Sequence, residues 1–237
     1  MLVVMPDLPQ AFSGASAAAA PQASTGRRPQ AERSRQSRHR ILDAAVACLV
    51  EEGYARTNTL TIQARAGVSR GRLLHQFPSK DELLVAAAHH VCAARLAEAE
   101  AVERTLPSAA EDPAARLDAV VDLLWRTFHL PHFWAATELW VAARTEPALA
   151  EVIRPAERRL GRVIRSAMDG LFGAEVAAHP LYPTVRQVLF TSMRGVALTY
   201  TFDRRDITTE PALPHWKRLA RSTLLPPPIL GDHVGYT

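Results

Sequence analysis

Apolar residues recur at intervals of three and four residues along most of the chain, and this spacing predicts helices. A first helix is expected over residues 36–52, with Gly53 as its stop, and another from Ser79 to about residue 103. Proline or glycine breaks the remaining pattern into expected helices at about 112–130, 132–145, 147–172, 182–204 and 213–224. Pro155 is expected to kink or split one of them. The alternating pattern of strands does not occur, so the predicted fold class is all-α.

The stretch from Thr57 to Lys80 predicts two short helices around a tight turn. Asn58 is a candidate N-cap in front of a helix whose apolar positions, Leu60, Ile62 and Ala66, share one face. Gly67 follows the last of these, where a left-handed residue would end the helix.

A second short helix is expected over residues 70–77, with Ser69 as its N-cap. Leu73 and Phe77 are four residues apart and therefore share an inward face, so that Arg72 and the polar residues near it point elsewhere. The sequence Ser79-Lys80-Asp81-Glu82 then supplies a capping box for the next helix. Two helices joined by a glycine-bearing turn, the second short and basic outside, predict a helix-turn-helix.

The motif AGVSRGRLLHQFPSK, residues 66–80, resembles the signature of the TetR family of transcriptional regulators, which is close to A-G-V-S-x-G-x-L-Y-x-H-F-x-S-K. Leu74 stands where the family usually has a tyrosine that contacts a DNA phosphate, and Gln76 where it often has histidine. The resemblance covers residues 36 to about 94. It implies an N-terminal three-helix DNA-binding head followed by a larger helical domain for ligand binding and dimerisation.

By this division, residues 1–34 are expected to be a disordered basic arm, 35–94 the DNA-binding domain, 95–225 the effector-binding and dimerisation domain, and 226–237 a tail. The distribution of charge along the chain agrees with this division into domains. Residues 1–80 carry 11 Lys and Arg against 5 Asp and Glu, whereas residues 81–237 carry 17 against 19. A positive balance at the helix-turn-helix end is what neutralising DNA phosphates requires, although a solvated face is the simpler alternative.

Arginine bonds guanine bidentately, so Arg70 and Arg72 are the best candidates for contact with base edges, with His75 and Gln76 as secondary candidates. The resemblance implies that Asn58, Thr59, Ser69 and Lys80 hold phosphates, and that Gly71 belongs to the same DNA-binding surface. It further implies a homodimer that places two heads on a pseudo-palindromic operator.

The second half of the chain concentrates aromatic residues near a carboxylate, and two interpretations stay open: a packed core, or a pocket for an apolar or aromatic effector, with a cation as one option. A buried Glu138 would need a partner such as Arg144. The candidate pocket residues are Trp125, Phe128, Phe133, Trp134, Glu138, Trp140 and Arg144.

Residues 182–204 are apolar or small around most of the helical circumference, so this helix needs cover on most sides. The resemblance implies that the last two long helices pair with their mates in a dimer, whereas burial within one chain is the alternative. The candidate interface residues are Val185, Val188, Leu189, Ser192, Val196, Thr199, Tyr200, Trp216 and Leu219.

Other classes of protein find little support in the sequence. Histidine, cysteine and acidic residues do not occur at metal-ligand spacing, and catalytic or nucleotide-binding motifs are missing, so neither an enzyme nor a bound cofactor is expected. Cys48 and Cys92 lie in apolar helical patterns and are expected to be buried thiols of a cytoplasmic protein without a membrane span. The sequence thus predicts a DNA-binding regulator, most simply a repressor released by an unidentified small molecule. The alternative is a helical small-molecule-binding protein with degenerate or sequence-blind DNA binding.

Overall fold

The computed structural model describes residues 30–226, with the backbone alone for residues 95–100. These residues form helices and no strand, which confirms the all-α prediction. The elements are α1 (Gln30–Arg56), α2 (Thr59–Ala66), α3 (Arg70–Gln76), α4 (Lys80–Glu103), α5 (Pro113–Thr127), α6 (Pro131–Ala143), α7 (Pro147–Phe172), α8 (Ala174–Ala177), α9 (Tyr182–Thr199), the 3-10 turn η1 (Ile207–Thr209) and α10 (Leu213–Leu224).

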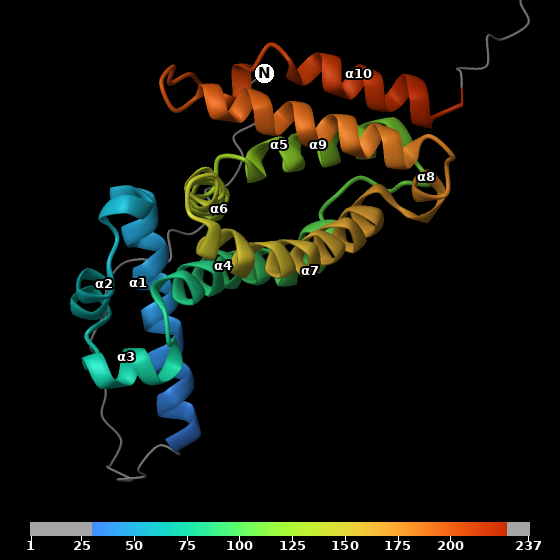
Figure 1. Ribbon diagram of the computed structural model, residues 1–237. Helices are drawn as coiled ribbons and strands as arrows, with labels where there is room; N and C mark the ends of the chain where they lie inside the picture. Colours follow the sequence, from blue (N-terminus) through green and yellow to red (C-terminus); the bar gives the residue numbers. More distant parts are fainter. Residues whose placement is uncertain (1–29, 227–237) are drawn as a thin grey trace, which may run out of the picture.

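The first three helices form a head at one end of the molecule, and α4 runs from this head into the body (Figure 1). The core of the head is built from fully buried aliphatic residues such as Ile41, Leu49, Ile62 and Leu83. The same core continues into α6 and α7 through Ala135, Leu139, Leu149 and Ile153. The head is therefore packed onto the body by a shared hydrophobic core.

A second core joins α5, α9 and α10 with the end of α7. In Figure 1, α5, α9 and α10 form an upper layer of the body, and α4 and α7 a lower layer. Trp125, Phe172 and Tyr182 are among the largest fully buried side chains of this second core. The body thus has two layers, with α6 at the end that faces the head.

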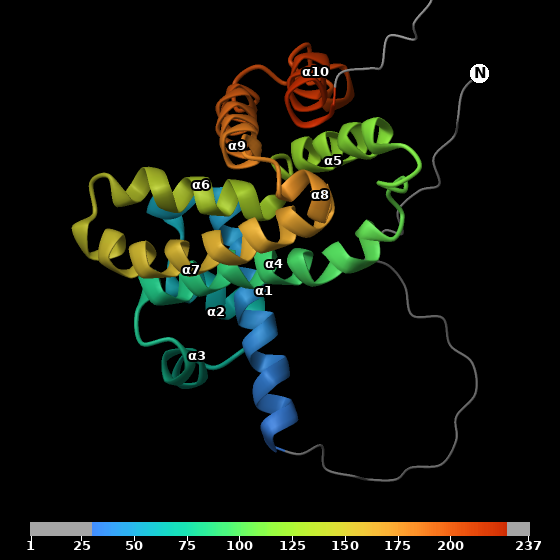
Figure 2. The ribbon, with the colours of Figure 1, turned by 90° about the vertical axis from the view of Figure 1, so that its right-hand side faces the viewer.

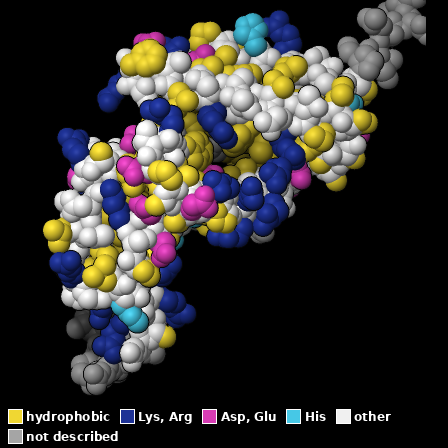
Figure 3. Space-filling model, in the orientation of Figure 1, with side chains coloured by type: hydrophobic (Ala, Val, Ile, Leu, Met, Phe, Trp, Pro, Cys, Tyr) yellow, Lys and Arg dark blue, Asp and Glu magenta, His cyan; other side chains and the backbone are white. Residues whose placement is uncertain are grey.

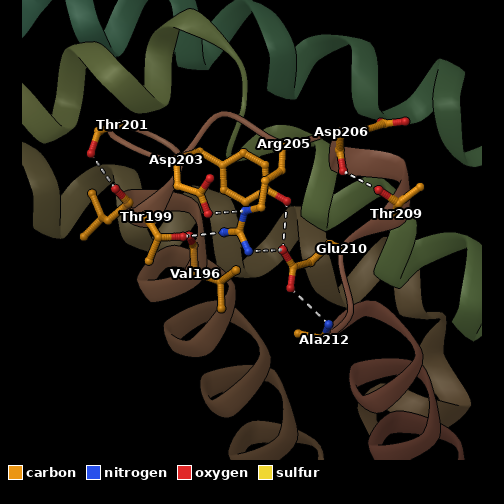
Figure 4. Close-up of polar contacts among 11 residues, drawn as sticks. Val196, Thr199, Thr201, Asp203, Arg205, Asp206, Thr209, Glu210 and Ala212 are labelled. Carbon is orange, nitrogen blue, oxygen red and sulfur yellow. Dashed lines mark hydrogen bonds and ion pairs between the residues drawn. The ribbon is translucent and has the colours of Figure 1, made fainter.

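The connection between α9 and α10 is held by a polar network around Arg205 and Glu210 (Figure 4). The Arg205 guanidinium donates to Thr199 Oγ1 at 2.6 Å, and its Nη1 lies 3.8 Å from Glu210 Oε2. The buried Glu210 carboxylate also accepts from the Tyr200 hydroxyl at 2.8 Å and from the Ala212 amide at 3.0 Å. These bonds fix the last two long helices relative to each other.

Several predicted boundaries need correction. Helix α1 begins at Gln30, so residues 30–34 are helical and are not part of a disordered arm. The run that follows Pro29 has neither glycine nor proline, and Glu32 in the first turn pairs with Arg35 at 2.6 Å, which favours a helix there. Residues 1–29 and 227–237, which include most of the expected arm and tail, lie outside the described residues.

Helix α7 is not split at Pro155. Pro155 lies on the exposed face of the helix, whereas Leu149, Ile153 and Ala156 are buried on the opposite face. These buried residues precede and follow the backbone hydrogen bond that the proline removes, so packing keeps the helix continuous there. Helix α9 ends at Thr199 rather than at residue 204. The expected boundary between residues 94 and 95 falls inside the continuous helix α4, which the head and the body share.

Candidate DNA-binding head and effector site

The turn between α2 and α3 has the local structure that the sequence predicts. Asn58 Oδ1 accepts from the amides of Leu60 and Thr61 at 2.9 and 3.0 Å, and Gly67 adopts the left-handed conformation with φ 61°. Ser69 Oγ accepts from the Arg72 amide at 3.3 Å and caps α3. Its hydroxyl proton remains available to a phosphate oxygen. Leu60 departs from the prediction, because its side chain is 62% exposed whereas Ile62 and Ala66 are buried.

Helix α3 buries one face and exposes the other. Leu73 and Phe77 are buried in the head, as predicted, and Arg70, Arg72 and His75 are exposed. A Cβ added to Gly71 would meet nothing within 4 Å, so the helix surface around it is open to a large partner. Gln76 is half-buried, and its Oε1 atom has no hydrogen-bond partner among the described residues.

The side chain of Lys80 is engaged within the head. Its Nζ donates to the Tyr54 carbonyl at 2.8 Å and lies 3.9 Å from the centroid of the Tyr54 ring. The Tyr54 hydroxyl in turn donates to Asp81 at 2.9 Å. The start of α4 is thereby tied to the end of α1. An ammonium group has three N–H donors. The bond to the Tyr54 carbonyl uses one of them, so another can make the predicted contact with a phosphate.

The first turns of α1 carry exposed arginines at positions 33, 35, 38 and 40. Figures 1 and 2 both place the free end of α1 at the same end of the molecule as α3, and in Figure 2 it projects beyond α2 and α3. The Arg38 guanidinium lies 4.4 Å from the centroid of the Phe77 ring and so connects this extension to the recognition helix. The basic end of α1 and the exposed face of α3 therefore form one surface.

In the body, the aromatic residues divide into two groups. Trp125, Phe128 and Phe133 are buried core residues, and Trp125 Nε1 donates to the Ile207 carbonyl at 2.7 Å. Trp134 and Trp140 are only half-buried at the edge of the same core. Packing therefore accounts for the first group, and the second is available to a ligand.

The expected position of Glu138 is wrong. Its side chain is exposed, and Oε2 accepts from the Tyr54 amide of the head at 3.2 Å. Gly53 comes so close that an added Cβ would lie 3.0 Å from the same oxygen. The turn of helix that carries Glu138 faces α1, and Arg144 is exposed as well. Neither residue is an internal charge of an aromatic pocket.

Figure 3 shows a hollow between the two layers of the body, with hydrophobic side chains inside it and Lys or Arg side chains at its border. Arg194 of α9, which is not among the residues predicted from the sequence, reaches from the upper layer toward α6. Its guanidinium carbon is 4.9 Å from the centroid of Trp140 on α6 and 5.0 Å from that of Phe190. Two arginines, Arg186 and Arg194, interrupt the mostly apolar sequence of α9, and this was the signal that could have identified Arg194.

The predicted dimer face of α9 also needs correction. Val185, Leu189, Tyr200 and, on α10, Trp216 are buried within the chain. Val188 and Leu219 are exposed, while Ser192, Val196 and Thr199 are half-buried. A row of exposed residues follows a heptad spacing instead, from Leu181 just before the helix through Thr184, Val188, Thr191, Gly195 and Leu198 to Phe202 in the turn after it. Two faces of α9 are apolar, and periodicity alone could not tell which one the chain itself covers.

Cys48 and Cys92 are buried free thiols, as predicted, and burial raises the pKa of Cys92 to about 11. Within residues 30–226, no group of three or more His, Cys, Asp or Glu side chains is placed to hold a metal ion. None of the helices described there is long and apolar enough to cross a membrane.

The fold and the exposed basic helix define a helix-turn-helix DNA-binding protein. Residues 41–87 match the model of the bacterial regulatory proteins of the tetR family. An HTH-type transcriptional regulator of Mycobacterium tuberculosis is 30% identical over 173 residues, which cover 72% of this chain and 86% of that protein. The chain therefore belongs to the TetR family of transcriptional regulators.

Solved structures agree with this fold. A TetR transcription regulator from Haloarcula marismortui aligns with a TM-score of 0.58 and 20% identity, over 81% of this chain and 100% of that one. The multidrug binding protein EbrR, in complex with ethidium, aligns with a TM-score of 0.55 and 24% identity, over 77% of this chain and 98% of that one.

Proposed function

We propose that this regulator is a repressor that binds a pseudo-palindromic operator as a homodimer and is released by a small molecule. The observation that carries the proposal is the pairing of an exposed basic recognition helix with a hollow body joined to it by one continuous helix. Two copies of α3 would enter successive major grooves about 34–36 Å apart. Arg70 and Arg72 would read base edges, and Ser69, Lys80 and the basic end of α1 would hold phosphates.

The exposed heptad stripe of α9 supports the homodimer. Five of the ten large hydrophobic side chains exposed within the described residues lie on this stripe or on α10: Leu181, Val188, Leu198, Phe202 and Leu219. Threonine and glycine alternate with them along α9, and a Cβ added to Gly195 would meet nothing within 4 Å. Small residues between apolar ones allow a second helix to approach closely, so two α9 helices can pack along this stripe.

The hollow between the layers supports the effector. Its hydrophobic lining and the half-buried Trp134 and Trp140 are typical of a site for an apolar or aromatic molecule. In EbrR, the same fold accommodates ethidium, a flat aromatic compound. Helix α4 forms part of the lower layer and also packs in the head, so a ligand that shifts α4 would change the separation of the two heads.

A second candidate function keeps the small-molecule site but not the sequence reading. Leu74, at the position where the family usually has tyrosine, is 41% exposed on α3 and offers a phosphate no hydrogen bond. DNA binding would then be sequence-blind and would rest on the arginines alone.

Selection from a random DNA pool at near-physiological salt separates these functions. We expect enrichment of a pseudo-palindrome whose half-sites are one helical turn apart, and release of that DNA by an effector. A folded dimer that binds the pool but enriches no sequence would contradict the repressor and favour the second function.

A further inference from the structure

The most unusual charged group of the body is the Arg194 guanidinium. It lies against the rings of Trp140 and Phe190, and its Nε atom is hidden from solvent without a hydrogen-bond partner in the part of the chain that the structure describes. Aromatic rings attract a cation but accept no strong hydrogen bond from it. A buried guanidinium N–H without an oxygen partner is costly, so a position of this kind calls for one.

The carboxylate whose charge acts on Arg194 makes its own contact elsewhere. Glu157 of α7 acts on Arg194 through its charge, but its Oε1 lies 3.3 Å from His89 Nε2 of α4 and makes its contact there. Burial lowers the pKa of the Arg194 guanidinium, and the Glu157 carboxylate opposes this only in part. Burial thus destabilises the charged form of Arg194, and a second anion would offset this effect.

The surroundings favour an anion over a cation. Helix α7, on the lower layer, exposes Arg158, Arg159, Arg162 and Arg165 within two turns. Figure 3 shows Lys and Arg side chains gathered beside the hollow. Such a border raises the local concentration of anions and repels organic cations. The carboxylate that the sequence suggested for a cation, Glu138, is bonded to the head instead.

We propose that Arg194 is the group that recognises the effector, and that the effector is an organic acid whose carboxylate bonds the guanidinium while its apolar or aromatic body lies against Trp140 and Phe190. A planar guanidinium matches a carboxylate bidentately, which fixes the orientation of the ligand. This inference rests on the proposed function, since it takes the hollow to be the effector site.

The test uses matched compounds on the full-length protein without DNA. Benzoate, phenylacetate and 2-naphthoate are each compared with the neutral amide and with the amine of the same carbon skeleton, by calorimetry and by thermal stabilisation. We expect at least one acid to bind, and its amide and amine to bind at least tenfold more weakly. In Arg194→Gln, the affinity for that acid should fall on the order of tenfold to a hundredfold.

Arg204→Gln is the control, because Arg204 is an exposed arginine on the α9–α10 connection. It should bind the acid as the unmodified protein does. Arg194→Lys keeps the charge without the planar donors and should recover only part of the affinity. If Arg194→Gln unfolds, Arg194→Lys carries the test.

Three outcomes would overturn the inference: no acid binds, the amide or amine binds as well as the acid, or Arg194→Gln retains full affinity. Failure of the proposed function has a different signature. An acid that binds through Arg194 but does not release the selected operator would leave this inference intact and contradict effector-controlled repression. Release of the operator by a neutral compound or by ethidium would support effector-controlled repression and contradict the inference that the effector is an acid.

Discussion

On α3, the arginine side chains and the caps serve different purposes, and single substitutions can separate them. Arg72 is exposed, and its backbone amide, not its side chain, bonds Ser69. We expect Arg72→Ala to relax the sequence preference at one position of each half-site and to cost about 1–3 kcal/mol of specific binding. Binding to random DNA should weaken much less. Selection with the variant checks this, and an unchanged preference would remove Arg72 from base reading.

Lys80→Ala should act differently, because a lysine that holds a phosphate reads no sequence. Specific and random DNA should lose affinity alike, and the slope of log affinity against log salt should flatten by about one unit per head. The variant also loses the bond to the Tyr54 carbonyl, so its thermal stability should drop. Binding assays over a salt series, made well below the melting temperature, separate the two effects. A loss of stability with an unchanged slope would leave Lys80 a purely structural role.

For single residues, the sequence correctly predicted the contacts that are made with neighbours along the chain. The caps at Asn58, Ser69 and Gly67 involve atoms within a few residues, and all three have the predicted form. Glu138 and Arg194 could not be placed in the same way. The first bonds a residue 84 positions earlier, and the second meets rings from two helices. Such contacts depend on how the helices cross.

Between elements, the contact of α6 with the end of α1 is one polar link from body to head. The Tyr54 amide, which follows the non-helical Gly53, donates to Glu138 Oε2 at 3.2 Å. Glu138→Ala removes this acceptor and should lower the free energy of unfolding by about 0.5–1.5 kcal/mol. Glu138→Gln keeps an acceptor oxygen and is the matched control. Thermal or urea unfolding measures both, and equal losses in the two variants would mean that the charge, not the bond, matters.

The same contact lies between the body, where we propose that the effector binds, and the DNA-binding head. Glu138→Ala should therefore bind operator and effector separately with little change, while the effector releases the DNA less completely. Coupling of this kind is a free energy between two sites, and it needs an element with two arrangements that both sites bias. Release curves for the alanine and glutamine variants, made on the same operator, would show whether α6 is that element.

The residues predicted for the dimer face of α9 came from both its inward and its outward side. Its inward side carries Tyr182, Val185, Leu189, Met193 and Ala197, all buried, and its outward side carries the heptad stripe. Both sides repeat every three to four residues, so both match a helical template. The helix bounds and the need for cover could be predicted from the sequence. The choice of face depends on where α5 and α10 lie.

For the whole molecule, the proposed homodimer would make two heads act together. Val188 is 45% exposed in the middle of the heptad stripe, and Val163 on α7 is 52% exposed away from it. Val188→Glu places two carboxylates opposite each other in a symmetric interface and should yield a folded monomer. Val163→Glu makes the same change at a similar exposure and should remain a dimer. Sedimentation and circular dichroism test both expectations.

The monomer should reveal how much of the DNA binding belongs to the pair. Each head alone keeps its own phosphate contacts, so the salt slope on a half-site should be about half of that on the full operator. Without the second head, affinity for the full operator should fall on the order of a hundredfold or more, because the second contact is no longer intramolecular. A Val188→Glu protein that stays dimeric would exclude the heptad stripe as the interface. A monomer that keeps full operator affinity would show that one head suffices, and the basic end of α1 would then be the remaining source of affinity to test.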